Sequence, residues 1–320
     1  PASNDYQGGF MVDLMNKDLG LALAAAQASD SAVPMGQKAA ELFKDHGAQG
    51  HGRLDFSSIY QHYSSKKVWC IKVKGKVFVI TGGARGLGLA IAQAITHKGG
   101  ICALVDSDQA AVDLAAASCG TQSNGYACNI TQEPEVEMLF EQVLADFGRL
   151  DGLVNNAGLL HDGMLIKFKD GQVQGKMSLS QWQSVIDVNL TGTFLCGREG
   201  AIAMAKAGNG GVIVNISSIA KAGNIGQSNS AATKAGVAAL VTTWAGELKR
   251  FGIRAVGIAP GVMSTDMTDS MKPEALERIE KVIPEGRLGD WTELASAAMF
   301  IIENDYMNGR LLELDGGLRF

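Results

Sequence analysis

The chain has 320 residues, of which 46% are hydrophobic and 19% are charged, the balance of a soluble globular protein with a large core. Its formal net charge of −5 argues against nucleic acid as the main partner, because phosphate binding needs a basic surface. No uninterrupted apolar stretch is long enough to span a bilayer, so we expect no membrane insertion.

Cysteine usage points to a reducing compartment. The five cysteines are scattered and odd in number, and no pair has metal-ligand spacing. Thiols stay reduced in the cytosol, where disulfides are rare. We therefore expect a cytoplasmic protein and no metal site.

Residues 1–67 differ from the rest of the chain and predict a small all-α N-terminal segment. Apolar residues recur at helical spacing over 10–30, and 34–50 opens with proline and ends in glycine, as a helix does. A third, shorter helix with an aspartate at its start is predicted over 55–65. No convincing strand appears in this segment. We place the domain boundary at 67/68.

From residue 68 onward, apolar strands alternate with helical stretches. "KVFVITGGARGLGLAIAQAI" (76–95) is a strand, a glycine turn and an amphipathic helix. Further strands are predicted at 101–106, 152–158, 211–218, 253–261 and 310–317. Such alternation predicts an α/β fold with a doubly wound parallel sheet of the Rossmann type, covered by helices on both faces.

The glycine turn "TGGARGLG" (81–88) predicts a dinucleotide site. Glycines allow a tight turn and close approach of the main chain to a pyrophosphate, whose charge is favoured at a helix N-terminus. The alternative is a plain turn from strand to helix, but a strand before and a helix after strengthen the binding hypothesis.

The motifs taken together are specific to one family. They are T-G-x-x-x-G-x-G at 81–88, "NNAG" at 155–158, "VNLTGTF" at 188–194, "VNISS" at 214–218, Lys234 and "PGVMSTDM" at 260–267. In this order and spacing, residues 68–320 resemble the short-chain dehydrogenase/reductase family, and within it the 3-oxoacyl-(acyl carrier protein) reductases and 3-hydroxyacyl-CoA dehydrogenases. The resemblance implies an oxidoreductase of fatty acid metabolism that interconverts 3-oxoacyl and 3-hydroxyacyl groups of an acyl thioester, or another ketone, with NAD or NADP.

The N-terminal segment has a different likeness. "YQGGFMVDLMNKDLGLALAAA" and "DFSSIYQHY" resemble the C-terminal helical part of the 3-hydroxyisobutyrate dehydrogenase family. Its three short helices carry apolar faces that must pack on the second domain, on a partner chain or on one another.

The first resemblance assigns a set of cofactor contacts. By their place in the family motifs these are Thr81, Gly82, Arg85, Gly86, Leu87, Gly88, Asp106, Asn129, Ile130, Asn155, Ala157, Gly158, Lys234, Pro260, Gly261, Val262 and Thr265. Asn129 stands where the family usually has an aspartate near the adenine, and an amide can still accept and donate hydrogen bonds there.

Two of these residues give opposite indications about the cofactor. Asp106 ends the second strand, where a carboxylate accepts hydrogen bonds from ribose hydroxyls and repels a 2′-phosphate. Arg85 is a basic residue that NADP-dependent members often carry before Gly86. A carboxylate that faces the ribose 2′ position repels a 2′-phosphate directly. An arginine has a flexible side chain that can point into water instead of binding that phosphate. We therefore expect NAD, with NADP as the alternative.

The resemblance also locates the reaction centre. The family's proton-relay asparagine falls at Asn189, its lysine at Lys234 and its proton-donating tyrosine at Ser230. The carbonyl-polarising serine is Ser217 if residues are counted back from position 230 without a gap, and Ser218 if the strand is aligned. We choose Ser218, because a one-residue deletion in a loop costs less than a shift in strand register.

Serine at position 230 predicts impaired activity. A phenol has a pKa near ~10 that a neighbouring ammonium can lower, whereas an aliphatic alcohol is far too weak an acid. We expect cofactor binding to survive and turnover to fall by at least ~100-fold. Two alternatives remain open: a non-catalytic NAD-binding scaffold or sensor, and, more remotely, a hydrolase that uses Ser230 and Lys234 as a dyad.

A long excursion over 159–187 borders the expected substrate cleft and carries Lys167, Lys169 and Lys176. These lysines either meet phosphates of CoA or of a carrier protein, or are solvated on an exposed hairpin, which we favour. By resemblance, helices near 192–207 and 230–250 pair between subunits, so a homotetramer is expected.

Overall fold

The computed structural model describes residues 6–60, 73–264 and 273–319 and divides the chain into two compact units, Pro1–Trp69 and Cys70–Phe320. The expected boundary at 67/68 falls within residues 61–72, outside the described residues, and stays a prediction. In the described part of the chain, no helix combines the length and the apolar character needed to cross a bilayer.

The described part of the first unit is helical. The two helices predicted over 10–30 and 34–50 are α1 (Val12–Ala28) and α2 (Pro34–His46), and α2 runs on into a π-helical turn, η2 (Gly47–His51). The third predicted helix begins as a short 3₁₀ turn, η3 (Phe56–Ser58), and continues as α-helix at Ile59 and Tyr60. The rest of that stretch, from 61 on, lies outside the described residues. The Asp55 carboxylate caps the turn by accepting the Ser57 N–H at 3.0 Å.

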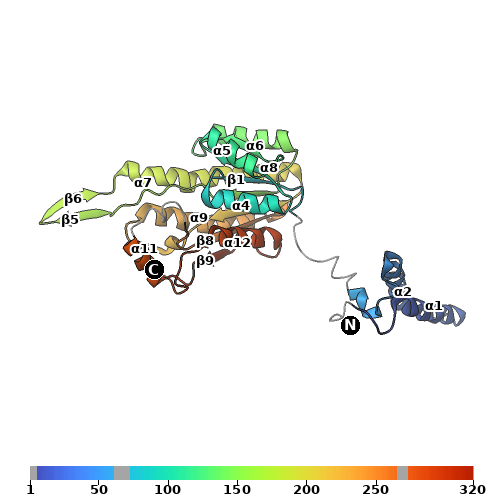
Figure 1. The fold of residues 1–320 in the computed structure, drawn as a ribbon. Coiled ribbons are helices and arrows are strands. Elements are labelled where there is room, and N and C mark those ends of the chain that lie inside the picture. Colours follow the sequence, from blue (N-terminus) through green and yellow to red (C-terminus); the bar gives the residue numbers. More distant parts are fainter. Residues whose placement is uncertain (1–5, 61–72, 265–272, 320) are drawn as a thin grey trace. The chain divides into compact units, whose positions relative to one another are not determined.

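The second unit is built on a parallel sheet that has seven strands within the described residues (Figure 1). In spatial order they are β3 (Asn124–Ala127), β2 (Ile101–Asp106), β1 (Val77–Thr81), β4 (Gly152–Asn155), β7 (Gly211–Ile216), β8 (Ile253–Pro260) and β9 (Leu311–Leu314). The order reverses direction between β1 and β4. In doubly wound sheets ligands bind at this switch point, beyond the carboxyl ends of the strands.

Helices cover both faces of this sheet. In chain order they and the short turns among them are α4 (Gly86–His97), α5 (Gln109–Ser118), α6 (Glu133–Phe147), α7 (Leu179–Ile186), η4 (Asp187–Gly192), α8 (Thr193–Ala207), η5 (Ile219–Ala222), α9 (Ser228–Glu247), η6 (Lys249–Phe251), α11 (Pro273–Val282) and α12 (Trp291–Glu303).

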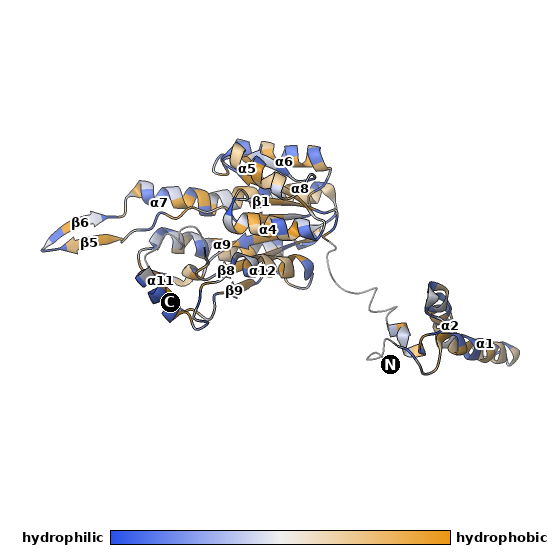
Figure 2. Ribbon diagram, in the orientation of Figure 1, coloured by the Kyte–Doolittle hydropathy of each residue, from blue (hydrophilic) through white to orange (hydrophobic). Residues whose placement is uncertain are grey.

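Alternation along the strands divides the core into two layers. Phe78 and Ile80 face a cluster with α4, α5 and α12, whereas Val77 and Val79 face a cluster with α6 and α8. All five residues of β1 are buried, as expected for a strand covered on both sides, and Figure 2 shows the apolar centre of the unit. The α/β fold predicted from the sequence is confirmed.

An antiparallel hairpin departs from this architecture. It consists of β5 (Ile166–Lys169) and β6 (Gln172–Lys176), and every residue in it except Gly175 is exposed. Figure 1 shows it projecting from the sheet-containing unit beyond the start of α7. The exposed hairpin expected there is present, and Lys167, Lys169 and Lys176 are all exposed. The alternative, contact of these lysines with phosphates, stays a prediction.

Candidate cofactor and active site

The glycine turn between β1 and α4 has a backbone that only glycine adopts without strain. Gly82 and Gly86 have φ of +62° and +55°. A Cβ at position 82 would lie 2.9 Å from the Cα of Ala157, and a Cβ at Gly88 would collide with the carbonyl oxygen of Gly82. The turn is therefore packed closely against the start of α4 and the chain that follows β4.

Asn156 ties the turn to that following chain. Its Nδ2 donates to the carbonyl oxygens of Thr81 and Gly82 at 3.1 and 3.0 Å. The Thr81 hydroxyl in turn accepts the N–H groups of Asn156 and Ala157, each at 3.1 Å. Asn156 was not among the residues predicted from the family motifs, although it is the second amide of "NNAG".

The N-terminus of α4 is open to a ligand. Arg85 is its N-cap residue, and no side chain caps the helix through a hydrogen bond. Free N–H groups and the helix dipole at such an end favour an anion, and the phosphates of a dinucleotide are anions.

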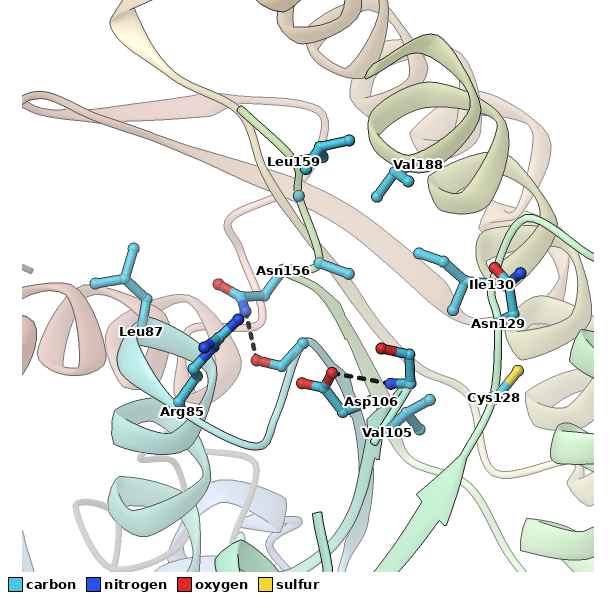
Figure 3. Close-up of a pocket in the computed structure, with 14 residues that line it drawn as sticks. Arg85, Leu87, Val105, Asp106, Cys128, Asn129, Ile130, Asn156, Leu159 and Val188 are labelled. Atoms are coloured by element: carbon cyan, nitrogen blue, oxygen red, sulfur yellow. Dashed lines mark hydrogen bonds between the residues drawn. The ribbon is translucent and has the colours of Figure 1, made fainter. Parts of the chain in front are cut away.

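A cavity of about 450 Å³ lies next to this helix end (Figure 3). Its lining comes from the carboxyl ends of β1, β2 and β4, the segment after β3, the start of α4 and η4. The residues are Gly82, Arg85, Leu87, Val105, Asp106, Ser107, Cys128, Asn129, Ile130, Asn156, Ala157, Gly158, Leu159 and Val188. The glycine turn, the open helix end and the polar groups at the rim fit a nicotinamide dinucleotide.

Asp106 stands at the end of β2 with its carboxylate at this cavity. Oδ2 accepts the N–H of Ala84 at 3.3 Å and Oδ1 accepts the N–H of Ser107 at 2.9 Å. These two bonds fix the carboxylate while leaving it partly exposed. A carboxylate oxygen has two lone pairs, so Asp106 can still accept from a ribose hydroxyl.

The other expected cofactor contacts fall into three groups. Asn155 is buried in the sheet, where its Nδ2 donates to Asn215 Oδ1 at 2.9 Å. Among the described residues, Val262 lines a separate pocket beside β9, and Pro260 and Gly261 are not part of the 450 Å³ cavity. Thr265 lies outside the described residues.

Helix α9 presents Lys234 toward the end of β7. Its Nζ donates to the carbonyl oxygen of Ile216 at 2.8 Å, and burial lowers the pKa of Lys234 to about 8. A Cβ on Gly158 would lie 3.9 Å from this Nζ and 3.6 Å from Asn189 Oδ1. Lys234 and Asn189 therefore meet beside Gly158, which also lines the cavity.

Asn189 sits in the π-helical turn η4, where an extra residue per turn redirects side chains. It is 1% exposed, and both ends of its amide bond to the backbone of Leu159. Oδ1 accepts the Leu159 N–H at 2.7 Å, and Nδ2 donates to the Leu159 carbonyl at 3.1 Å.

The two candidate serines at the end of β7 have different surroundings. Ser217 is 2% exposed, and its hydroxyl donates to the backbone carbonyl of Lys234 at 2.8 Å. Ser218 is partly exposed, and its hydroxyl accepts the Ala220 N–H at 3.1 Å, capping η5. Ser218 thus keeps a hydroxyl hydrogen to donate.

Ser230 is buried, at 3% exposure, one helical turn before Lys234. Its hydroxyl donates to Asp162 Oδ1 at 3.2 Å, and Gln227 Nε2 donates to Asp162 Oδ2 at 2.7 Å. Asn229 Nδ2 holds the same segment through the His161 carbonyl at 2.9 Å. Asp162 was not singled out from the sequence, because no local pattern tells where a loop returns to a helix.

Neither alternative chemistry gains support from these contacts. The Ser230 hydroxyl bonds to a carboxylate and Lys234 Nζ to a carbonyl, which is not the arrangement of a serine–lysine nucleophile. Tyr126 donates to Asp146 at 2.6 Å and Tyr306 is 99% exposed, so neither replaces the missing phenol. Within the described ranges, no group of three His, Cys, Asp or Glu side chains could hold a metal.

Comparison with known proteins covers both units. Residues 82–319 match a family model of the short-chain dehydrogenase type, described as enoyl-(acyl carrier protein) reductase. Residues 1–63 match a model described as the NAD-binding part of NADP-dependent 3-hydroxyisobutyrate dehydrogenase.

Individual relatives align with most of the chain. The 3-oxoacyl-(acyl-carrier-protein) reductase FabG of Haemophilus influenzae is 34% identical over 249 residues, which are 77% of this chain and 99% of the relative. Its Thermotoga maritima counterpart is 35% identical over 254 residues, 78% of this chain and 99% of the relative. The human 3-hydroxyacyl-CoA dehydrogenase type-2 is 35% identical over 257 residues, 78% of this chain and 97% of the relative. With the sheet order and the glycine turn, these matches show that the chain belongs to the short-chain dehydrogenase/reductase family of nicotinamide-dependent oxidoreductases.

Proposed function

We propose that this chain is an NAD-dependent oxidoreductase for 3-oxoacyl and 3-hydroxyacyl thioesters whose turnover is slowed by Ser230. The relatives named for 3-oxoacyl-(acyl-carrier-protein) and 3-hydroxyacyl-CoA substrates support this substrate class. The observation that carries the proposal is the pairing of a buried Ser230 with Lys234 on α9, next to the cavity edge at Gly158.

Each remaining residue has a role that its surroundings support. The Lys234 ammonium would hold the ribose, the Ser218 hydroxyl would donate to the substrate carbonyl, and Asn189 would fix the chain after β4. A bound nicotinamide would supply or accept the hydride. No residue in this set is suited to transfer a proton to the carbonyl oxygen. Ser230 is too weakly acidic, and its hydroxyl already donates a hydrogen bond to Asp162.

Asp106 supports NAD as the preferred cofactor. Its carboxylate lines the cavity at the end of β2, where it would accept ribose hydroxyls and repel a 2′-phosphate. Arg85 also lines the cavity, and none of the hydrogen bonds found among the described residues fixes its guanidinium. We further propose a cytoplasmic location, supported by four free buried thiols among the described residues, and a homotetramer.

A non-catalytic NAD-binding role is the second candidate. It is favoured by the same Ser230–Asp162 hydrogen bond, which holds the segment after β4 over position 230. Such a protein would bind the dinucleotide and present it, or report its level, without turnover.

The test is a Ser230→Tyr variant assayed with acetoacetyl-CoA and NADH. For an impaired reductase we expect unchanged NADH affinity and a gain in turnover of at least ~100-fold, because a general acid contributes about 10²–10⁴-fold. Intact NADH binding without any gain would favour the non-catalytic role. If the unmodified chain does not bind NADH, both the reductase and the non-catalytic NAD-binding role are overturned.

A further inference from the structure

The hairpin of β5 and β6, with the two residues before it, forms an arm (residues 164–176) whose apolar side chains nothing in the described part of the chain covers. Ile166, Phe168 and Val173 are 58%, 64% and 61% exposed. Phe168 pairs directly with Val173, so the two side chains share a face. Ile166 pairs with Lys176 beyond a shift in register between Lys167 and Phe168. The arm therefore presents exposed apolar side chains next to its lysines.

Such an arm is not expected to be stable without a surface to pack against. An isolated two-stranded hairpin is marginally stable in water and needs a surface to pack against. The arm also carries three lysines and one aspartate, a net charge of +2 on a chain whose total is −5. Its partner should offer an apolar floor with carboxylates around it.

A groove with those properties lies between α6 and α8. Phe140, Leu144 and Ile202 supply apolar lining, and the charged lining residues are Glu137, Glu141, Glu199 and Lys206. Helix α6 carries five carboxylates and no basic residue. Arg198 of α8 engages Glu133 and Glu137 at 2.7 and 3.7 Å, whereas no ion pair within the described residues includes Glu141.

The arm and the groove of one chain lie at opposite ends of the same helical rod. α7, η4 and α8 run without a break from Leu179 to Ala207, a length of roughly 40 Å at 1.5 Å per residue. The arm precedes the first residue of this rod (Figure 1). The groove is lined on the α8 side by Glu199, Ile202, Ala203 and Lys206, which belong to the last turns of the rod. An arm therefore cannot reach the groove of its own chain.

We propose that the arm of one copy docks in the α6–α8 groove of a second copy of this chain. A twofold axis across the middle of the α7–α8 rod sets two rods antiparallel, so that each arm lies at the other copy's groove. Three apolar side chains bury much less than the roughly 1,200 Å² of a stable interface. The exposed Phe194 and Ile202 of α8, 43% and 40% exposed, extend the contact along the rod.

The direct test is zero-length carbodiimide cross-linking of an equal mixture of unlabelled and ¹⁵N-labelled full-length chain. We expect cross-linked peptide pairs that join Lys167, Lys169 or Lys176 to Glu137 or Glu141, half of them with mixed isotopes. The proposal would be overturned if every cross-linked peptide pair carried a single isotope. It would also be overturned if the copies cross-linked only through peptides outside the arm. So would a monomer at every concentration in sedimentation velocity.

Charge exchange tests the contact by a second route. Glu141→Lys should weaken self-association at least threefold, and adding Lys169→Glu should restore it. Gln142→Lys, which changes a neighbouring position outside the groove lining, is the matched control. A double variant no tighter than Glu141→Lys would contradict the pairing.

An anionic lipid surface is the other occupant that the arm's chemistry fits. Co-sedimentation with phosphatidylserine-containing vesicles, lost on Phe168→Ser while self-association is unchanged, would overturn docking to a second copy. None of these measurements involves dinucleotide or turnover, so they stand or fall separately from the proposed function.

Discussion

The Ser230 hydroxyl donates a hydrogen bond to Asp162, 3.2 Å away, from the position where the family's proton donor would stand. Gly163 adds a backbone bond to the carbonyl of Gly226 at 2.8 Å, so the segment after β4 is held along the start of α9. The serine thus acts as a structural tether in this state. That role differs from proton donation, and the difference can be measured.

Replacing Ser230 with alanine should leave residual turnover within about twofold of that of the unmodified chain, because removing a group that transfers no proton does not slow the reaction. Asp162 is exposed, so the lost hydrogen bond should cost no more than about 1 kcal/mol of stability. NADH-dependent reduction of acetoacetyl-CoA and urea denaturation provide the two readouts. A tenfold fall in turnover with unchanged NADH affinity would mean that the serine is the working acid after all.

Asp106→Ala should change cofactor choice. We expect NADH to bind about tenfold more weakly, which is 1.4 kcal/mol, and NADPH to bind more tightly, because the repulsion of a 2′-phosphate is removed. Asp108→Ala is the matched control, since Asp108 caps α5 through the Ala111 N–H and is not part of the cavity lining. Titration by NADH fluorescence checks both. Equal effects of the two substitutions would remove Asp106 from the ribose site.

Gly88→Ala should destabilise the sheet-containing unit by about 1–3 kcal/mol and abolish dinucleotide binding, because the new Cβ meets the Gly82 carbonyl in the glycine turn. Gly246→Ala in α9 is the comparison. Nothing lies within 4 Å of a Cβ there, so we expect unchanged binding and a gain of about 0.5–1 kcal/mol. Chemical denaturation measures both, and a stable Gly88→Ala variant that binds NADH would refute the packing argument.

The lowered pKa of Lys234 makes stability depend on pH. The pKa is about 8 in the folded protein and 10.5 ordinarily, so between these values the unfolded chain binds more protons. The free energy of unfolding should therefore rise with pH from about 8 to 10.5, and the penalty for protonating the folded protein is fully present below pH 8. Tryptophan fluorescence in urea should show that Lys234→Met lacks this part of the rise. Parallel curves for the two proteins would mean that Lys234 is not desolvated.

The fold was predictable where apolar runs are buried on both faces. The strands predicted at 101–106, 211–218 and 253–261 correspond to β2, β7 and β8, because a strand between two helical layers must be apolar throughout. The same pattern missed β3, whose four residues, "NGYA", contain no apolar run. Because β3 lies at the edge of the sheet, it does not need to be apolar throughout.

The site was predictable to the extent that it lies on those strands. Gly82, Asp106 and Gly158 each follow or end a strand, and parallel strands bring their ends together at one edge of the sheet. The exposed hairpin in the excursion after β4 was the alternative favoured from the sequence, and the structure has it. The contact of Asp162 with Ser230 depends on tertiary packing that no local pattern encodes. Local sequence therefore left open what covers position 230.

Asn189 has a consequence for the chain beyond the cleft. Because its amide grips both backbone groups of Leu159, the ends of the intervening stretch are clamped at one point on η4. We expect that length can be added or trimmed within the arm without moving Leu159, which lines the cavity. The surface of the arm should therefore tolerate change while Leu159 and Asn189 keep their positions at the cleft.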